Sequence, residues 1–313
     1  MKDVCLPSAS LRERIQQLDP AIEVADRAVI WQTGELSEAD HANLAEVEFW
    51  VPGFLLSDVA ALDAAISAMP RLRVIQSQSA GVDTFIGHTP DGVILCDARG
   101  VHGSATAEWA LTAVLSVLRE FPRFTRAQLD RRWDRTVTDE LAGKRVLIIG
   151  AGDVGEQLAR RVAACDASTT MVARHARAGV HATSELPELL PDADVVVVIV
   201  PKTPATVGMV DAEFLAKMAD NALLVNAARG PIVDTEALLS ELRSGRLRAA
   251  LDVVDPEPLP ADHALWTAPN LLLTPHVGGS VLGFEARAAE LISAQLARFT
   301  RGEPLINVVD GDY

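Results

Sequence analysis

Three side chains suited to acid–base and anion-binding chemistry each follow an apolar stretch of the sequence. Arg229 lies in NAARG, Glu257 in LDVVDPEPLP and His276 in NLLLTPHVGG. If the apolar stretches are parallel strands, these residues share the carboxyl edge of one sheet, where open α/β sheets bind ligands. Each residue alone fits a surface ion pair or a solvated loop at least as well. Their common position favours a single shared site.

The chemistry that these three side chains could perform together is proton donation to a carbonyl group that is being reduced. A carboxylate beside an imidazole stabilises the imidazolium, so Glu257 would keep His276 protonated. The imidazolium can donate its proton to a carbonyl oxygen as a hydride reaches the carbonyl carbon. The planar fork of Arg229 can bind a 2-keto acid through its carboxylate and ketone oxygens.

A glycine motif upstream indicates where the hydride donor would bind. In KRVLIIGAGDVGEQLARRVA, Gly150, Gly152 and Gly155 form GxGxxG between an apolar strand and a helix. The first glycine allows a tight turn, the second lets the backbone approach a pyrophosphate, and the third lets the helix pack on the strand. The motif alone also occurs in methyltransferases and other nucleotide folds. Its strand–turn–helix context predicts a dinucleotide site at the helix N-terminus.

The choice of cofactor depends on the residues that follow the next strand. An acidic side chain about 20 residues beyond the glycine motif binds the ribose 2′-hydroxyl of NAD. Here no carboxylate lies between Asp166 and Glu185, and Arg174, His175 and Arg177 occupy the expected position. Two permanent cations suit a 2′-phosphate, although they could equally be surface arginines on a connecting loop. We therefore predict that NADP(H) is preferred and that NAD(H) remains possible.

The alternation of apolar strands and helices predicts an α/β fold with two domains. Strand candidates in the first hundred residues are DRAVIWQ, VEFWV, LRVIQSQ and GVILCDA. A second series is KRVLIIG, TTMVARH, ADVVVVIVP, NALLVNAAR, RAALDVV and NLLLTPH, which is one complete doubly wound unit. We expect a dinucleotide-binding Rossmann domain at 101–283, inserted into a smaller substrate domain made of 1–100 and 284–313. The arginine-rich stretch at 123–140 is interpreted as a surface helix and loop.

Composition excludes several other classes of function. The 313 residues carry a formal charge of −15, which disfavours binding to nucleic acid or to an anionic membrane surface. The three cysteines form no CxxC pair, and the start MKDVCLPSASLRERIQ lacks the apolar core of a signal peptide. The apolar run VVVVIV is too short to span a bilayer. We expect a soluble, cytoplasmic protein without a metal site.

Taken together, these motifs make the chain resemble the D-isomer-specific 2-hydroxyacid dehydrogenase family over nearly its whole length. The resemblance rests on SAGVD (79–83), TAEWAL (106–111), LAGKRVLIIGAGDVG (141–155), NAARGPIVD (226–234), LDVVDPEPLP, LLLTPHVGG and GEPLINVV (302–309). It implies Arg229 as substrate binder, Glu257 as the partner of His276, and His276 as the acid/base. It also implies a flavodoxin-like substrate domain, and a loop of Ser79, Ala80 and Gly81 whose amides hold the substrate carboxylate.

The same resemblance implies further contacts to the cofactor. Besides the glycine loop and His276, these fall on Thr106, Asp153, Val154, Pro201, Thr206, Ala227, Asp252 and Gly278. It further implies a homodimer paired through the nucleotide domain. The sequence departs from the family at Trp109, where many members carry histidine; we interpret this tryptophan as a core residue.

The resemblance leaves two functions and many substrates open. The leading one is an NAD(P)-dependent reductase of glyoxylate, hydroxypyruvate, pyruvate or a bulkier 2-keto acid, giving the (R)-2-hydroxy acid. The alternative is a dinucleotide-sensing binding protein of the corepressor type, which uses the same fold. A methyltransferase would leave Arg229, Glu257 and His276 unexplained.

Overall fold

A computed structural model describes residues 3–32, 37–54, 56 and 58–310 of the chain. The chain divides into two compact units. Unit 1 consists of residues 1–102 and 282–313, and unit 2 consists of residues 103–281. Each unit is an α/β structure built on its own sheet, so the predicted fold class is confirmed.

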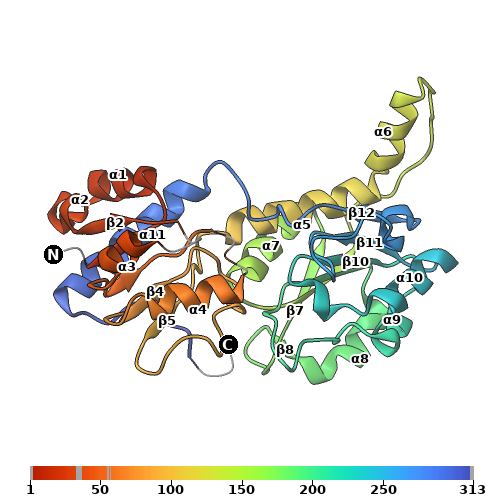
Figure 1. The fold of residues 1–313 in the computed structure, drawn as a ribbon. Helices are drawn as coiled ribbons and strands as arrows, with labels where there is room; N and C mark the ends of the chain where they lie inside the picture. The colour runs from red at the N-terminus through yellow and green to blue at the C-terminus, as the bar shows by residue number, and fades with distance from the viewer. Residues whose placement is uncertain (1–2, 33–36, 55, 57, 311–313) are drawn as a thin grey trace. The chain divides into compact units, whose positions relative to one another are not determined.

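Unit 1 is a parallel sheet with helices packed against it (Figure 1). Its strands are β1 (Val4–Leu6), β2 (Ala28–Ile30), β3 (Phe49–Trp50), β4 (Val74–Gln76) and β5 (Ile94–Cys96). Its helices are α1 (Ala9–Leu18), η1 (Pro20–Ile22), α2 (Val24–Arg27), α3 (Glu38–Leu44), α4 (Val59–Ser67) and α11 (Phe284–Arg301).

The strand order in unit 1 is β2-β1-β3-β4-β5, and every neighbouring pair is parallel. This is the flavodoxin-like order. Four of the five strands were predicted from the sequence, and β1, which has only three residues, was not. All three are buried, so no polar alternation marks the strand. On one side of the sheet, α11 packs its buried Ala288, Ile292 and Leu296 into the apolar core.

Unit 2 has a larger sheet, again parallel throughout. Its strands are β6 (Arg145–Ile149), β7 (Ser168–Ala173), β8 (His181–Ala182), β9 (Val195–Val198), β10 (Leu223–Asn226), β11 (Arg248–Leu251) and β12 (Leu271–Leu273). Its helices are α5 (Gly103–Leu118), α6 (Phe121–Leu129), α7 (Asp153–Ala163), η2 (Thr183–Glu185), α8 (Leu186–Leu189), η3 (Leu190–Asp192), α9 (Ala212–Lys217), η4 (Gly230–Ile232), α10 (Thr235–Ser244) and η5 (Ala264–Thr267).

The strand order in unit 2 is β12-β11-β10-β9-β6-β7-β8, a doubly wound order that reverses direction at β6. The six predicted strands are present. The seventh, β8, was missed because it is two residues long and pairs only with the end of β7. The central strand β9 is four valines, all fully buried, as expected for a strand covered on both faces.

Local sequence signals account for several helix boundaries. Asp58 caps α4 by accepting hydrogen bonds from two backbone amides, and Asp234 caps α10 through the amide of Ala237. Helix α10 ends at Gly245, whose φ of 76° is in the left-handed region that glycine adopts without strain. These short-range interactions fix where α4 and α10 begin and where α10 ends.

An arm formed by residues 119–140 projects from the end of α5 (Figure 1). Arg123 donates two hydrogen bonds of 2.9 Å to Asp134 and so ties α6 to the returning segment. These bonds, with one from Arg132, lower the pKa of Asp134 to about 2. The expected surface helix and loop is therefore present, and Trp133 within it is 95% exposed.

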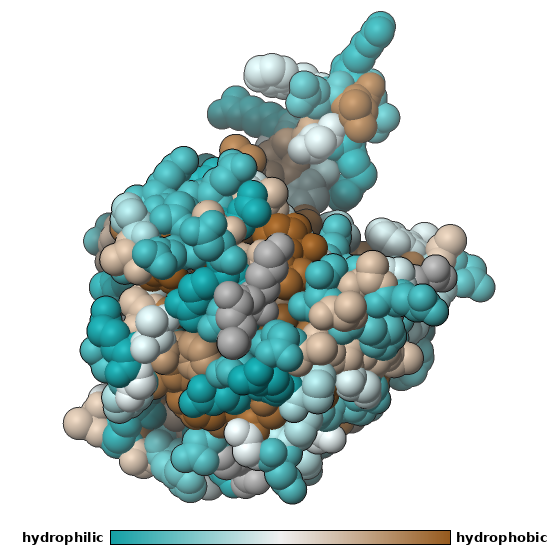
Figure 2. Space-filling view, turned by 60° about the vertical axis from the view of Figure 1, so that its left-hand side comes forward, coloured by the Kyte–Doolittle hydropathy of each residue, from teal (hydrophilic) through white to brown (hydrophobic). Residues whose placement is uncertain are grey.

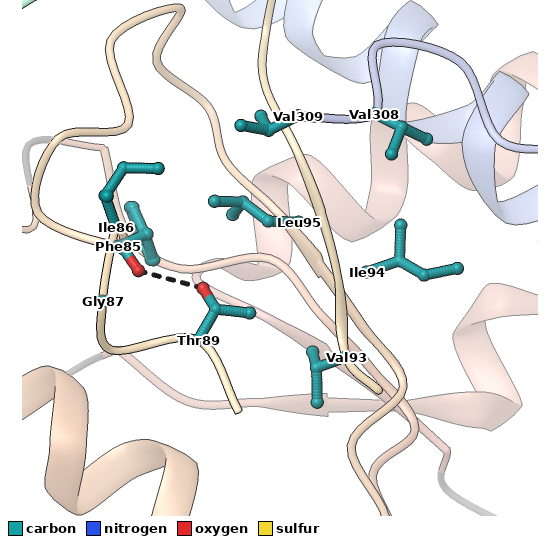
Figure 3. A pocket seen from close by; sticks show the side chains of 9 residues that line it. All are labelled: Phe85, Ile86, Gly87, Thr89, Val93, Ile94, Leu95, Val308 and Val309. Atoms are coloured by element: carbon teal, nitrogen blue, oxygen red, sulfur yellow. Dashed lines mark hydrogen bonds between the residues drawn. The ribbon is translucent and has the colours of Figure 1, made fainter. Parts of the chain in front are cut away.

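The segment after α11 follows the edge strand β5 of unit 1. The amide of Val309 donates to Leu95, and that of Asp97 to Asn307. Figure 3 shows a pocket beside this segment, lined mainly by apolar side chains from three stretches of unit 1. Its volume is about 340 Å³. The residues that line it are Phe85, Ile86, Gly87, Thr89, Val93, Ile94, Leu95, Val308 and Val309.

Membrane-spanning helices and metal-ligand clusters are absent from the described residues. None of their helices combines the length and the apolar character needed to cross a membrane. No group of three or more histidine, cysteine, aspartate or glutamate side chains in the described part of the chain could hold a metal ion.

Candidate active site

The predicted catalytic residues of unit 2 follow three adjacent strands. Arg229 follows β10, Glu257 follows β11 and His276 follows β12, and these strands are neighbours in the sheet. Because the strands are parallel, their carboxyl ends lie at one edge, which also carries the turn after β6. The sheet topology therefore groups these segments at one edge, as the sequence analysis expected.

His276 and Glu257 form the shortest polar contact of this edge. The imidazole Nδ1 lies 2.5 Å from Oε1 of Glu257. Since the carboxylate can only accept, Nδ1 carries the hydrogen and Nε2 is the atom left for a ligand. The two side chains are 35% and 38% exposed, so unit 2 leaves this pair open to solvent and to ligands. The geometry is that of an imidazole held in one orientation by a carboxylate.

The backbone of His276 is in a conformation that non-glycine residues rarely adopt. Its φ is 53°, in the left-handed region, which carries a cost for any residue with a Cβ. Hydrogen bonds from the surrounding chain hold it there, beginning with the His276 amide, which donates to the carbonyl of Asp252 at 2.7 Å. Such strain, kept in place by neighbouring contacts, is typical of functional loops.

The side chain of Asp252 fixes the rest of this loop. It is only 4% exposed, and its two carboxylate oxygens accept from the amides of Val277 and Gly278 at 2.9 and 2.8 Å. The hydroxyl of Thr274 donates to the same carboxylate at 2.6 Å. A buried carboxylate is stable only when such donors surround it. Asp252 was predicted to contact the cofactor; the structure shows its carboxylate bonded to the His276 loop.

The turn that carries Arg229 is set by a buried asparagine. Asn226, the last residue of β10, is fully buried and donates from its side-chain amide to the carbonyl of Arg229 at 3.0 Å. Its side-chain oxygen accepts from the amide of Ala228. The Arg229 guanidinium donates to the carbonyl of Ala228 at 2.8 Å. The half-buried arginine is thus anchored at both its backbone and its side chain.

The glycine motif adopts the strand–turn–helix arrangement expected from the sequence. Gly150 follows β6 with a φ of 124°, and a Cβ added there would collide with the carbonyl of Ile199. A Cβ on Gly155 would collide with the carbonyl of Gly150, so helix α7 packs directly on the turn. These two close backbone approaches explain why positions 150 and 155 are glycine.

The second glycine of the motif lies where a phosphate could bind. Gly152 is the N-cap of α7, and a Cβ added to it would meet open space. No side chain of the described residues caps this helix, so its first amides can bind an anion. Asp153 and Val154 form the first turn of α7, and Asp153 accepts from Gln157 at 3.0 Å. The loop fits the pyrophosphate of a dinucleotide.

The three basic residues predicted to read the ribose lie in an exposed loop between β7 and β8. Arg177 and Val180 exchange two backbone hydrogen bonds around a tight turn with Gly179 at a φ of 75°. The guanidinium of Arg177 donates to the carbonyl of Ala151, inside the glycine motif, at 2.6 Å. Arg177 therefore lies directly beside the phosphate loop, whereas Arg174 and His175 immediately follow β7 and are exposed.

The nearest carboxylate after this loop is engaged elsewhere. Glu185 accepts from the side chain of His181 at 2.7 Å and from the amide of Ala182 at 2.7 Å. The hydrogen bond from His181 is the main reason that the pKa of Glu185 is lowered. Glu185 is thus bonded within its own segment and does not pair with the basic side chains of the preceding loop in these hydrogen bonds.

The remaining predicted cofactor contacts of unit 2 are distributed over several elements. Pro201 and Thr206 share the loop after β9, where the threonine hydroxyl donates to the proline carbonyl at 2.6 Å. Ala227 follows β10, and Thr106 lies in the first turn of α5. Gly278 is buried beside Asp252 and Trp109, the tryptophan interpreted as a core residue.

The predicted carboxylate-binding loop belongs to unit 1. Ser79, Ala80 and Gly81 follow β4, and Ser79 is held by the hydroxyl of Ser77 and by the amide of Ala98. The preceding carbonyl, that of Gln78, lies 2.7 Å from Nε2 of the buried His102. The imidazole of His102 stacks on the ring of Phe54 at 5.4 Å. Buried polar contacts therefore give this loop a defined conformation.

The nucleotide-binding part of the chain matches a known protein family. Residues 111–278 match the family profile of the D-isomer specific 2-hydroxyacid dehydrogenase NAD-binding domain. The chain belongs to the D-isomer specific 2-hydroxyacid dehydrogenase family. Members of this family are oxidoreductases that use a nicotinamide cofactor.

Relatives of this dehydrogenase differ in the substrates that they are named for. This chain is 33% identical over 261 residues to a glyoxylate reductase of Thermofilum pendens. The aligned residues make up 79% of this chain and 76% of that relative. This chain is 31% identical to a D-3-phosphoglycerate dehydrogenase of Archaeoglobus fulgidus, covering 78% of this chain and 48% of the relative. The chain thus spans about half the length of that second relative.

A solved structure resembles the dehydrogenase along its length. The D-isomer specific 2-hydroxyacid dehydrogenase of Xanthobacter autotrophicus Py2, in complex with NADPH and MES, superposes with a TM-score of 0.82 at 30% identity and covers 98% of both chains.

Two residues of this edge escaped the sequence analysis. Asn226 and Thr274 each fix a loop that carries a predicted catalytic residue, through the bonds described above. Asn226 lies inside an apolar strand, and a polar residue in such a strand is a signal that can be found in sequence. Thr274 gave no comparable signal, because a threonine at the end of a strand is ordinary.

Proposed function

We propose that the dehydrogenase reduces a small 2-keto acid, of the glyoxylate or hydroxypyruvate kind, to the (R)-2-hydroxy acid. The observation that carries this proposal is the 2.5 Å contact between His276 and Glu257 at the sheet edge that also carries the glycine loop. The similarity to a glyoxylate reductase supports the substrate class. When bound, the nicotinamide supplies the hydride.

Residues of unit 2 perform the acid–base chemistry in this proposal. His276 donates a proton from Nε2 to the carbonyl oxygen of the substrate, because its Nδ1 is engaged by Glu257. The Glu257 carboxylate stabilises the imidazolium before the transfer and holds the ring in place. Arg229 binds the substrate through two parallel hydrogen bonds. The hydrogen bond from Asn226 to the carbonyl of Arg229 fixes the backbone from which the guanidinium extends.

In the same proposal the two units have separate tasks. Residues 101–283 act as the dinucleotide-binding domain, with Gly150, Gly152 and Gly155 at the pyrophosphate. Residues 1–100 and 284–313 act as the substrate domain, whose amides near Ala80 and Gly81 bind the substrate carboxylate. The ordered turn at Ser77 and Ser79 supports this role, because an anion site made of amides needs a fixed backbone.

NADPH is the preferred cofactor in this proposal, and three observations support the preference. Arg177 lies beside the phosphate loop through its bond to Ala151, Arg174 directly follows β7, and Glu185 is engaged by His181. Phosphate groups favour guanidinium partners over neutral ones. The related Xanthobacter structure contains NADPH.

The proposal is tested by mixing the protein and NADPH with a panel of 2-keto acids and following the absorbance of the reduced nicotinamide. We expect oxidation with at least one of glyoxylate, hydroxypyruvate and pyruvate, and formation of the (R)-2-hydroxy acid on chiral chromatography. NADPH that binds tightly but is oxidised with no member of the panel would instead favour the dinucleotide-sensing binding protein.

We also infer that two copies pair through unit 2. Large apolar side chains protrude along the arm: Phe121, Leu129, Trp133 and Val137 are 59%, 80%, 95% and 95% exposed. Figure 2 shows the arm as a projecting part on which apolar atoms lie among polar ones. Apolar groups presented in this way are typical of protein–protein contacts. Sedimentation velocity should show a dimer for the natural chain and monomers for Leu129→Asp; a monomeric natural chain would refute the pairing.

A further inference from the structure

Behind the His276 loop, a chain of hydrogen bonds leads to helix α5. The indole Nε1 of Trp109 donates to the hydroxyl oxygen of Thr274 at 3.1 Å. That hydroxyl donates to Oδ1 of Asp252 at 2.6 Å, and the Asp252 carboxylate accepts from the amides of Val277 and Gly278. The chain thus connects a side chain of α5 to the two residues that follow His276.

The indole of Trp109 fixes the direction of the hydrogen bonds that follow it in this series. An indole N–H can only donate, so it occupies a lone pair of the Thr274 oxygen. The hydroxyl hydrogen is then directed to the carboxylate of Asp252, which can only accept when ionised. Trp109 therefore selects the hydroxyl orientation that supports an ionised Asp252, and an ionised Asp252 is what holds the two loop amides.

Packing provides a second, independent link between Trp109 and the loop. A Cβ added to Gly278 would lie 2.8 Å from Oδ2 of Asp252 and 3.4 Å from Cγ of the indole. The loop backbone therefore rests directly against the tryptophan ring and the carboxylate. The strained backbone of His276, with its φ of 53°, is confined between this support and its own bond to the Asp252 carbonyl.

We propose that Trp109 is a positioning residue for His276, acting through Thr274 and Asp252. This inference rests on the proposed function, because its effect on turnover presupposes that His276 donates the proton. Trp109 does not enter the reaction; it keeps the 276–278 loop in the one conformation that presents the imidazole to the substrate. A positioning error of this kind reduces the rate of the chemical step more than it reduces cofactor affinity.

The test separates the hydrogen bond from the bulk of the ring. Trp109→Phe keeps an aromatic ring but removes the N–H, and should lower kcat about tenfold, as expected from the loss of one buried hydrogen bond. Trp109→His places a ring N–H at the same position and should recover most of that loss. The dissociation constant for NADPH should change less than kcat in both variants.

A matched control and a double mutant make the result specific. Trp31→Phe makes the same change at a buried tryptophan of unit 1 and should leave kcat unchanged. Thr274→Val removes the hydroxyl that links Trp109 to Asp252 and should lower kcat by about 10- to 100-fold, since it leaves a buried carboxylate less satisfied. Adding Trp109→Phe to Thr274→Val should cause no further loss, because both changes break one chain.

Two outcomes would overturn the inference. One is a Trp109→Phe enzyme with natural kcat; the other is a double mutant whose loss is the product of the two single losses. If the natural protein reduces no keto acid, the proposed function fails, and hydrogen exchange of residues 274–281 decides the positioning role alone. Faster exchange in Trp109→Phe than in Trp31→Phe would support it, and equal exchange would refute it.

Discussion

Two loops at the carboxyl edge of the unit 2 sheet are built in different ways. The loop at 274–278, after β12, is tied to the buried carboxylate of Asp252 by two backbone amides and one hydroxyl. The loop at 174–180, between β7 and β8, presents exposed basic side chains, and Arg177 links it to the phosphate loop by donating to the carbonyl of Ala151.

The difference follows from what each loop has to do. Proton transfer requires the donor nitrogen at a fixed place and angle, and a backbone held by a buried carboxylate provides that precision. Attraction of a phosphate needs only cations within reach, and long arginine side chains on a surface loop supply them. Substitutions in the first loop should therefore affect turnover, and substitutions in the second should affect the choice between cofactors.

The largest effect is expected at the acid–base residue of the first loop. His276→Ala removes the proton donor and should lower kcat by about 10²- to 10⁴-fold while NADPH still binds, because a general acid contributes to the chemical step. Stopped-flow turnover and fluorescence titration of NADPH measure the two quantities. A variant that keeps turnover within a few-fold of the natural enzyme would remove His276 from the mechanism.

The next effect concerns the residue that binds the substrate. Arg229→Lys keeps the positive charge but loses the planar fork, and should lower kcat/KM for the keto acid by about 10- to 100-fold. NADPH affinity serves as the internal control and should not change. Near-natural kcat/KM would mean that Arg229 does not clamp the carboxylate.

The second loop should respond with a change of preference and little loss of turnover. The natural enzyme should have a higher kcat/KM with NADPH than with NADH, and Arg174→Asp should reverse or abolish that ratio by placing an acid near the ribose. Arg177→Ala should reduce the ratio by about tenfold, as one charge-assisted hydrogen bond is lost. Arg243→Ala, at an exposed arginine in the last turn of α10, serves as the matched control. A natural preference for NADH, or a ratio unchanged in both arginine variants, would refute this role for the loop.

The smallest effect is expected from a change of charge beside His276. Glu257→Gln keeps a hydrogen-bond acceptor but removes the anion that stabilises the imidazolium. Reduction should slow by about tenfold or less, because the ring is still held but the anion beside the proton donor is gone. Steady-state kcat with the keto acid checks this directly, and a natural kcat would mean that the 2.5 Å contact does not support the proton donor.

The sequence by itself determined the fold class and the placement of the main motifs. Short β-branched apolar runs such as the four valines of β9 favour covered strands, and their alternation with helices favours a parallel sheet. Parallel strands end at one edge, so Arg229, Glu257 and His276 could be assigned to that edge before any coordinates were known. The glycine motif was equally readable, because only glycine tolerates the backbone contacts found at Gly150 and Gly155.

Tertiary structure decided what holds those residues in place. Asp252 was identified from its motif, but its bonds reach 22 to 26 residues along the chain, to Thr274, Val277 and Gly278. The bond from Trp109 to Thr274 spans 165 residues. Hydrogen-bond partners so far apart leave no periodic or local trace in a sequence, because folding alone brings them together. The strands β1 and β8 were missed for a local reason: three and two residues are too few to show a periodic pattern.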